Sequence, residues 1–159
     1  MKHDPKIPQS ATAGFVDDYL LYLLAAASEQ ASAQFHASVR KAGLRVPEWR
    51  VLACLHDRDG SMITRLADLA LAEQSRLTRI IAQMEDRGLV LRKNDPEDGR
   101  RVRVFLTDAG RALINELVPD ARAHEAALLK HLGSDTGAAL KSTLHTLLRA
   151  LADEDKAKS

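Results

Sequence analysis

The sequence contains one cysteine, Cys54, among its 159 residues. A single cysteine cannot form an intramolecular disulfide, and it leaves no pair of thiolates for zinc binding or redox exchange. Its neighbours on the predicted helix are apolar and disfavour the thiolate, so we interpret it as a buried structural thiol. The cysteine content therefore excludes a disulfide scaffold and favours a reducing, cytoplasmic compartment.

Long hydrophobic runs are also absent. No stretch approaches the roughly 18 consecutive apolar residues that a membrane span needs, and the opening MKHDPKIPQSATAG lacks the apolar stretch of a signal peptide. We therefore expect a soluble, cytoplasmic protein. Residues 1–13 are polar, contain two prolines and show no periodicity, which predicts a flexible arm.

Aromatic residues make up only 4% of the chain, and the formal net charge is only +1. The hydrophobic residues are mostly Ala and Leu, which are the best helix formers, so the composition predicts a mainly helical protein of one domain. Because the net charge is close to zero, any nucleic-acid binding must come from a local arrangement of charge.

Signatures of enzymes and metal sites are missing. The sequence has no glycine-rich phosphate loop, nucleophile elbow or HExxH motif. Glu85 and Asp86 are adjacent on a predicted helix and point apart. His124 and His131 have neither an HxxxH partner nor a cysteine to complete a zinc site. We expect no enzymatic activity, no cofactor and no metal ion.

What the sequence does contain is helical periodicity. Apolar residues recur at spacings of three and four from Val16 to Val39 and predict one long helix that ends at Gly43. Pro47 suits the first turn of a second helix, although the residues before it are poor N-caps and leave its start open.

Two further helices are predicted towards the C-terminus. Thr107 is a suitable N-cap for the first, and its interior Pro119 removes one backbone donor, so we expect a kink or a break there. Gly133 separates this helix from the last one, whose leucines recur from Leu140 to Leu151.

The middle of the chain predicts a winged helix. Ser61 is a plausible N-cap for a short helix over residues 63–70, and a second short helix ends at Gly88, which together make a helix-turn-helix. Residues 89–93 and 101–106 are rich in β-formers and flank a loop of turn formers, which predicts a hairpin with a charged tip.

The second short helix has the amphipathic pattern of a helix that reads DNA. Its apolar positions 77, 80, 81 and 84 form the inward face and leave polar residues on the outward N-terminal half. Arg can bond guanine and Gln can bond adenine in the major groove, and the amides at a helix N-terminus favour phosphate. An ordinary solvated face is the alternative. The predicted contacts are Gln74, Ser75, Arg76, Thr78 and Arg79.

Positive charge is concentrated in the hairpin. Residues 87–103 hold six basic and three acidic side chains, a local charge of +3. Arg100 at the tip can enter a narrow minor groove, with Asp98 holding its flexible side chain in place. The alternative is a solvated tip whose charges only deter edge aggregation. The predicted contacts of the wing are Asp98, Arg100 and Arg101.

These segments resemble the MarR family of bacterial transcription regulators through PEWRVLACL and ITRLADLALAEQSRLTRIIAQMEDRGLVLRKNDPEDGRRVRVFLTDAGR. The match covers residues 43–111, and its most specific part is the wing pattern from Asp98 to Thr107. Gly99 departs from the pattern, because many members carry a second wing-tip arginine there.

The resemblance implies a mainly α fold with a winged helix-turn-helix, a two-stranded β-hairpin wing and long N- and C-terminal dimerisation helices. It implies one domain over residues 14–159, with dimerisation helices in 14–46 and 112–153 and a DNA-binding lobe over 47–111. A C2 homodimer would then bind a pseudo-palindromic operator on double-stranded DNA, usually as a repressor.

Family habit also implies control by a small aromatic or phenolic acid that binds between the dimerisation helices and the lobe and releases the DNA. The candidate pocket residues are His36, Arg40, Trp49 and Arg50, whose alternative roles are in the core or in ion pairs. Two other functions stay open. One is a winged-helix module that binds a protein, and the other is a redox-responsive regulator that uses Cys54.

Overall fold

The computed structural model describes residues 14–158, which fall into two compact units that divide between Gln34 and Phe35. The predicted arm, residues 1–13, lies outside the described residues.

The first unit contains a 3₁₀ turn, Phe15–Asp18, and the first part of helix α1, Leu20–Lys41. The sequence predicted a helix from Val16 onwards, but Tyr19 is extended, with φ −79° and ψ 116°, so α1 starts later. The Asp17 carboxylate accepts a hydrogen bond from the N–H of Gly14 at 3.1 Å, which stabilises the separate turn.

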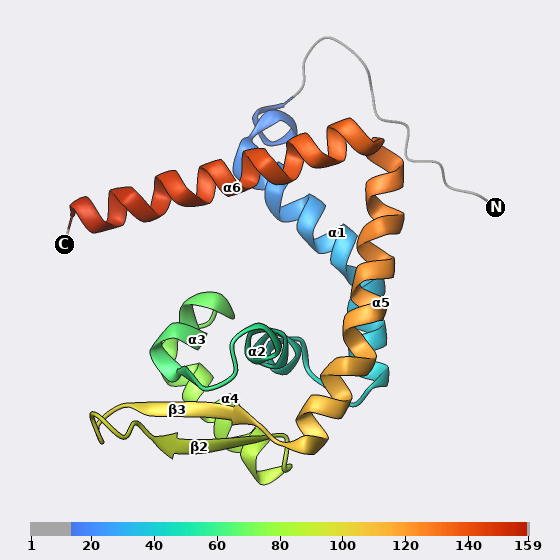
Figure 1. The fold of residues 1–159 in the computed structure, drawn as a ribbon. Helices are drawn as coiled ribbons and strands as arrows, with labels where there is room; N and C mark the ends of the chain where they lie inside the picture. Colours follow the sequence, from blue (N-terminus) through green and yellow to red (C-terminus); the bar gives the residue numbers. More distant parts are fainter. Residues whose placement is uncertain (1–13, 159) are drawn as a thin grey trace. The chain divides into compact units, whose positions relative to one another are not determined.

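The second unit holds the end of α1, helices α2 to α6 and a small sheet (Figure 1). Helix α2 packs against α5, α3 packs against α4, and α4 packs against strand β2. Within residues 14–158, every helix is too short or too polar to cross a membrane. The helices of this unit are α2 Val46–Asp57, α3 Ile63–Leu69, α4 Gln74–Asp86, α5 Asp108–Leu132 and α6 Ser134–Ala157.

The start of α2, which the sequence left open, lies at Val46 with Arg45 as N-cap. The N–H of Arg45 donates to Oε2 of Glu48 at 2.7 Å, so the side chain three residues into the helix caps it. The turn before it depends on Gly43, whose φ of +79° matches the predicted helix C-cap. This part of the chain therefore bends sharply from α1 into α2.

The sheet has three strands, β1 Ser61–Met62, β2 Val90–Asn94 and β3 Val102–Leu106, in the antiparallel order β1-β3-β2. The predicted hairpin is confirmed, but β1 was not predicted. Ser61 pairs with Val104 and its hydroxyl donates to the carbonyl of Arg58 at 2.6 Å, so it is not the N-cap of α3. A strand of two residues is too short to show a period in the sequence.

The sequence predicted a kink or a break at Pro119. Helix α5 runs through this residue as one helix, so the prediction of a break was wrong. Pro119 is exposed, and Ile114 and Leu117 in the preceding turns are buried in the core, which stabilises the helix despite the lost hydrogen bond. Gly133, with φ +79°, separates α5 from α6 as predicted. The mainly α winged-helix fold expected from the sequence is confirmed.

Candidate nucleic-acid interface

Helix α4 presents the two faces that its sequence predicted. Leu77, Ile80, Ile81 and Met84 are buried, with exposed fractions between 0 and 5%. The five predicted DNA contacts on this helix are all exposed. Because α4 buries its apolar face against α2, α3 and β2, its polar face is held rigidly at the surface.

A carboxylate of the chain itself caps the N-terminus of α4. Glu73 is the N-cap and accepts from both the N–H and the hydroxyl of Ser75, at 3.2 and 2.6 Å. These two hydrogen bonds lower the pKa of Glu73. The prediction that these amides receive a phosphate therefore needs a correction, because Glu73 competes for them.

The loop of the wing is held by Asp95, which is 6% exposed. Its carboxylate accepts from the N–H of Glu97 at 2.8 Å and pairs with the guanidinium of Arg103, and both bonds lower its pKa. Arg103 also donates to the carbonyl of Gly60 at 3.0 Å. In the sequence Asp95 is one of three acidic residues of the hairpin, and the structure shows that its hydrogen bonds fix the loop.

At the tip of the wing, Asp98 pairs with a different arginine from the one predicted. Its Oδ2 lies 3.3 Å from Nε of Arg101, and its Oδ1 accepts the backbone N–H of Arg100 at 3.1 Å. None of the ion pairs within residues 14–158 uses the Arg100 guanidinium. Asp98 therefore orders the backbone of Arg100 and leaves its side chain available.

Two cations counted in the wing are paired with carboxylates from outside it. Arg92 pairs with Glu85 at 2.7 Å, and Arg87 pairs with Glu48 at 3.1 Å. Including these two carboxylates lowers the local charge from +3 to +1. Lys93 lies 5.3 Å from the centroid of the Phe105 ring. The net positive charge at the wing is therefore smaller than the composition predicts, because two of its arginines are paired with carboxylates from other elements.

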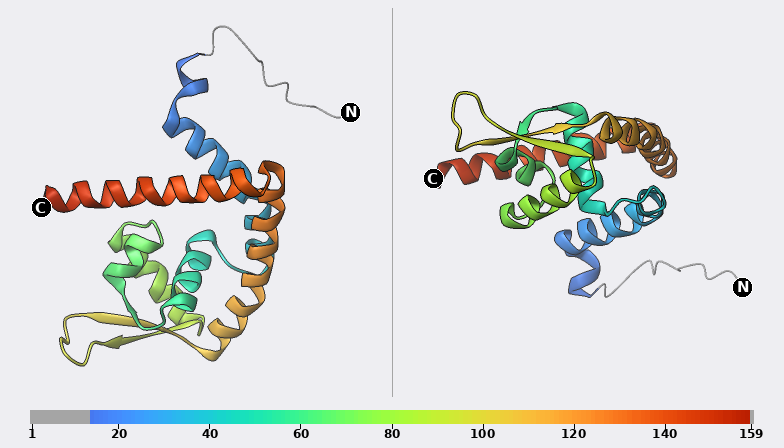
Figure 2. Two further views of the ribbon diagram at one scale, coloured as in Figure 1. Left: turned by 45° about the horizontal axis from the view of Figure 1, so that its top comes forward. Right: turned by 90° about the horizontal axis from the view of Figure 1, so that it is seen from below.

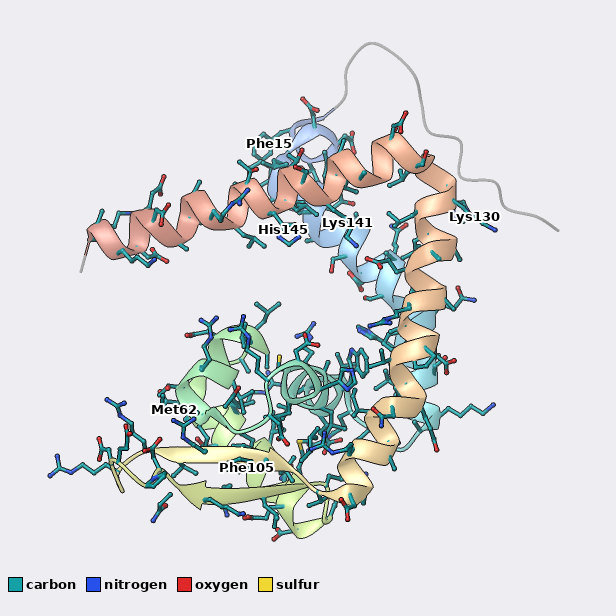
Figure 3. All side chains as sticks on the ribbon, in the orientation of Figure 1. Phe15, Met62, Phe105, Lys130, Lys141 and His145 are labelled. Atoms are coloured by element: carbon teal, nitrogen blue, oxygen red, sulfur yellow. The ribbon has the colours of Figure 1, made fainter. Side chains whose placement is uncertain are left out.

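Two grooves open beside α4. The first, which we call the wing-side groove, measures about 520 Å³ and includes Met62, labelled in Figure 3 together with Phe105 of β3. It joins Gln74 and Thr78 of α4 to Arg100 and Arg101 of the wing. The hairpin projects past α3 and α4 at its loop end (Figure 2). Helix α4 and the wing thus line one concave surface.

The second groove, the α2-side groove, measures about 350 Å³. It includes Arg76 and Arg79, so four of the five predicted contacts of α4 divide between the two grooves, and Ser75 lines neither. Arg45 and Gln83 also line it but were not among the predicted contacts, because Arg45 lies at the start of α2 and Gln83 lies beyond the N-terminal half of α4. The residues that line it are Arg45, Pro47, Arg76, Arg79, Ile80 and Gln83.

The four candidate effector residues are only partly brought together. His36 lies near Arg50 and Arg40, and burial together with these two charges lowers its pKa. Trp49 instead packs edge-on against Phe35, with ring centroids 4.9 Å apart. It lines a groove of about 340 Å³ between α2 and α5 that includes none of the other three residues.

Cys54 is partly buried, whereas the sequence predicted a buried thiol. Burial, and secondarily Asp57, raises the pKa of the Cys54 thiol, which opposes a reactive thiolate. In the part of the chain that the structure describes, no three His, Cys, Asp or Glu side chains gather where they could hold a metal ion.

The family model that matches this chain is that of the MarR family, over residues 44–102. A MarR family transcriptional regulator of Silicibacter pomeroyi DSS-3 has a solved structure that is 62% identical. It superposes with a TM-score of 0.79 and covers 87% of this chain and 99% of that chain. The organic hydroperoxide resistance transcriptional regulator of Bacillus subtilis (strain 168) is 30% identical over 136 residues, 86% of this chain and 91% of that protein.

Two other similar structures are of proteins that bind DNA. The transcriptional repressor CouR, bound to a 23-mer DNA duplex, is 28% identical with a TM-score of 0.76 and covers 87% of this chain and 99% of that chain. BpsR of Bordetella bronchiseptica, whose DNA binding is regulated by 6-hydroxynicotinic acid, is 25% identical with a TM-score of 0.73, covering 82% and 98%. This chain belongs to the MarR family of transcriptional regulators.

Proposed function

We propose that the protein binds a pseudo-palindromic operator as a homodimer and represses transcription until a small aromatic or phenolic acid releases it. The observation that carries this proposal is the wing-side groove, which places Gln74 and Thr78 of α4 on one surface with Arg100 and Arg101. A helix in the major groove and a wing in the adjacent minor groove need this juxtaposition.

In this proposal the exposed half of α4 reads the bases. Gln74 can bond adenine, and Arg76 and Arg79 can bond guanine through two parallel hydrogen bonds. Thr78 is exposed and its hydroxyl donates to the carbonyl of Gln74 at 2.9 Å, so the hydroxyl oxygen remains free to accept a hydrogen bond from a base. The Ser75 hydroxyl can donate a hydrogen bond to DNA only if it leaves Glu73.

The wing supplies the minor-groove contact. Arg100 enters the groove, where narrow A·T tracts have the strongest negative potential. Arg101 stays paired with Asp98 and lies beside the phosphates at the edge of the groove. Asp98 therefore acts on DNA through the loop that it orders rather than by direct contact.

A homodimer places two such surfaces on one operator. Leu140, Leu148 and Leu151 of α6 are exposed, with fractions of 44, 64 and 49%, and a partner subunit would cover them. We assign dimerisation to residues 14–46 and 112–153 and DNA binding to the lobe over 47–111. Half-sites about one helical turn apart, near 34 Å, follow from the two-fold symmetry.

The effector is proposed to be a small aromatic carboxylate in the cytoplasm. BpsR responds to 6-hydroxynicotinic acid, which belongs to this chemical class. Arg40 and Arg50 bring positive charge beside His36, which suits a carboxylate, and Trp49 supplies an aromatic surface beside α5. Release requires that the effector bind the DNA-incompetent state more tightly than the DNA-bound state.

The test is a titration of the full-length protein against the promoter region beside its own gene, over a series of salt concentrations. Phosphate contacts predict affinity that falls steeply with salt and a complex with two subunits per site. Absent or salt-independent binding would contradict the proposal and favour a module that binds a protein partner. Aromatic acids are then added to the complex, and at least one of them is expected to lower the affinity for DNA.

A further inference from the structure

The α2-side groove is lined by charged side chains of one sign, and its residues outside the base-reading Arg76 and Arg79 have no assigned role. Three of its six lining residues are arginines, Arg45, Arg76 and Arg79, and none is acidic. The other lining residues are Pro47, Ile80 and Gln83. In a chain whose net charge is +1, three guanidinium groups around about 350 Å³ form a concentrated positive site.

Arg45 is aimed into this groove by two side chains. Its Nη2 donates to Oε1 of Gln83 at 2.6 Å and to Oε1 of Glu48 at 2.9 Å. The side chain of Arg45 nevertheless remains 57% exposed. It is therefore oriented by the protein and still open to a ligand on its outer side.

Glu48 does not depend on Arg45 alone. Its side chain is 1% exposed, and both of its oxygens also accept from Nη1 of Arg87 at 3.1 Å. Arg87 is further held by the carbonyl of Gly43 at 2.7 Å. If Arg45 turns towards another anion, the buried carboxylate keeps a charged partner.

The groove also lies on a defined side of α4. Residues 76, 79, 80 and 83 share one face of a helix because they are spaced by three and four, whereas Gln74 and Thr78 line the wing-side groove. A helix in the major groove has a phosphate backbone on each side. The wing-side groove faces one backbone, which leaves the α2-side groove for the other.

We propose that the α2-side groove binds a backbone phosphate of the operator, with Arg45 as its ligand from the start of α2 and Gln83 as the residue that positions Arg45. This rests on the proposed DNA binding and adds a second phosphate site across α4 from the wing. A guanidinium binds a phosphate through charge-assisted, paired hydrogen bonds, so Arg45 contributes affinity without reading sequence.

The test compares Arg45→Ala and Arg45→Lys with Arg122→Ala, which removes an exposed arginine from α5, outside both grooves. Each variant is titrated over a salt series with its operator fragment and with an unrelated duplex. Arg45→Ala is expected to weaken binding about tenfold on both duplexes and to lower the salt slope by about one. Arg45→Lys should keep most of the slope, and Arg122→Ala should leave affinity and slope unchanged.

An Arg45→Ala protein whose salt slope equals that of the wild type would overturn the proposal, whether its affinity falls or not, since a purely structural role changes no phosphate contact. The backbone N–H that caps α2 is kept in every variant, and Arg45→Gln, which keeps a donor for Glu48, repeats the measurement if Arg45→Ala does not fold. A wild-type protein that binds neither duplex would refute the proposed function itself.

Discussion

Asp59, just after α2, accepts a hydrogen bond from Nη2 of Arg111 at 2.8 Å through Oδ2, and this ion pair connects α2 to the first turn of α5. Its Oδ1 accepts the N–H of Leu106 at 2.8 Å at the end of β3. One carboxylate therefore links the end of α2, the end of β3 and the start of α5.

Replacing this carboxylate is expected to loosen the wing. Asp59→Ala leaves the N–H of buried Leu106 without its partner, which costs about 1 to 3 kcal/mol of the free energy of unfolding. Asp59→Asn keeps an acceptor and should lose less. Urea unfolding of the three proteins measures this, and equal stability of Asp59→Ala and wild type would show that water or another group satisfies Leu106.

Acid should destabilise the protein in part through Glu48. Burial alone would raise the pKa of Glu48, but hydrogen bonds from Arg45 and the charges of Arg45 and Arg87 hold it below its usual value of 4.5. The unfolded chain therefore takes up the proton first. The stability that Glu48 contributes is complete above about pH 4.5 and is lost as the pH falls through the lower pKa of the folded state.

Urea unfolding between pH 7 and pH 3 tests this pH dependence, with Glu48→Gln as the matched variant. Gln keeps an acceptor for the cap of α2 but cannot titrate, so the variant should be less stable at pH 7 and should lose less stability on acidification. A variant with the same pH dependence as the wild type would assign acid lability to other carboxylates, such as Asp95, whose pKa is also lowered.

Replacement by alanine should destabilise the protein at Gly110 and have almost no effect at Gly99. A Cβ at Gly110 would lie 2.0 Å from the carbonyl oxygen of Leu89, at the close contact between α5 and the start of the wing, whereas nothing lies within 4 Å of a Cβ at Gly99. Gly110→Ala is expected to cost about 3 kcal/mol or more, and Gly99→Ala close to nothing. Thermal unfolding of both variants decides whether this backbone contact is as rigid as the structure indicates.

The helix and the wing should contribute differently to DNA affinity. Arg100→Ala is expected to weaken binding to all duplexes, while Arg76→Ala or Arg79→Ala costs about 1 to 3 kcal/mol only where the contacted base is present. Competition with operators mutated one base pair at a time separates the two behaviours. Unchanged affinity in all three variants would refute the assigned contacts.

Leu71 occupies a strained position in the turn between α3 and α4. Its φ of +56° is left-handed, and its side chain is 78% exposed, so little packing would be lost on its removal. Leu71→Gly is expected to raise the free energy of unfolding by about 0.5 to 1 kcal/mol, because relief of backbone strain exceeds the added entropy of the unfolded chain. Leu71→Ala keeps the strain and should show no such gain.

The order of the helices and the position of the hairpin could be predicted because their signals are local. The apolar spacing of α4 predicted its buried face, and Gly43, Gly88 and Gly133 predicted turns, as their φ values of +72° to +79° require. The start of α2 was harder, since its cap comes from Glu48 inside the helix rather than from a residue before it.

Contacts between residues far apart in the sequence could not be predicted from local patterns. Glu48 and Arg87 are 39 residues apart, and β1 is a strand only because β3 lies beside it. The predicted partner of Asp98 was its neighbour at the wing tip, yet the folded loop places Arg101 against it instead.

The sequence by itself determined that α4 turns its apolar face inward and that a charged loop follows it, because both depend on residues within a few positions of one another. Only the tertiary structure decided which arginines are paired internally and which are open to a ligand. A pairing requires two side chains within hydrogen-bond distance, and the fold alone brings Arg87 to Glu48 and Arg45 to Gln83.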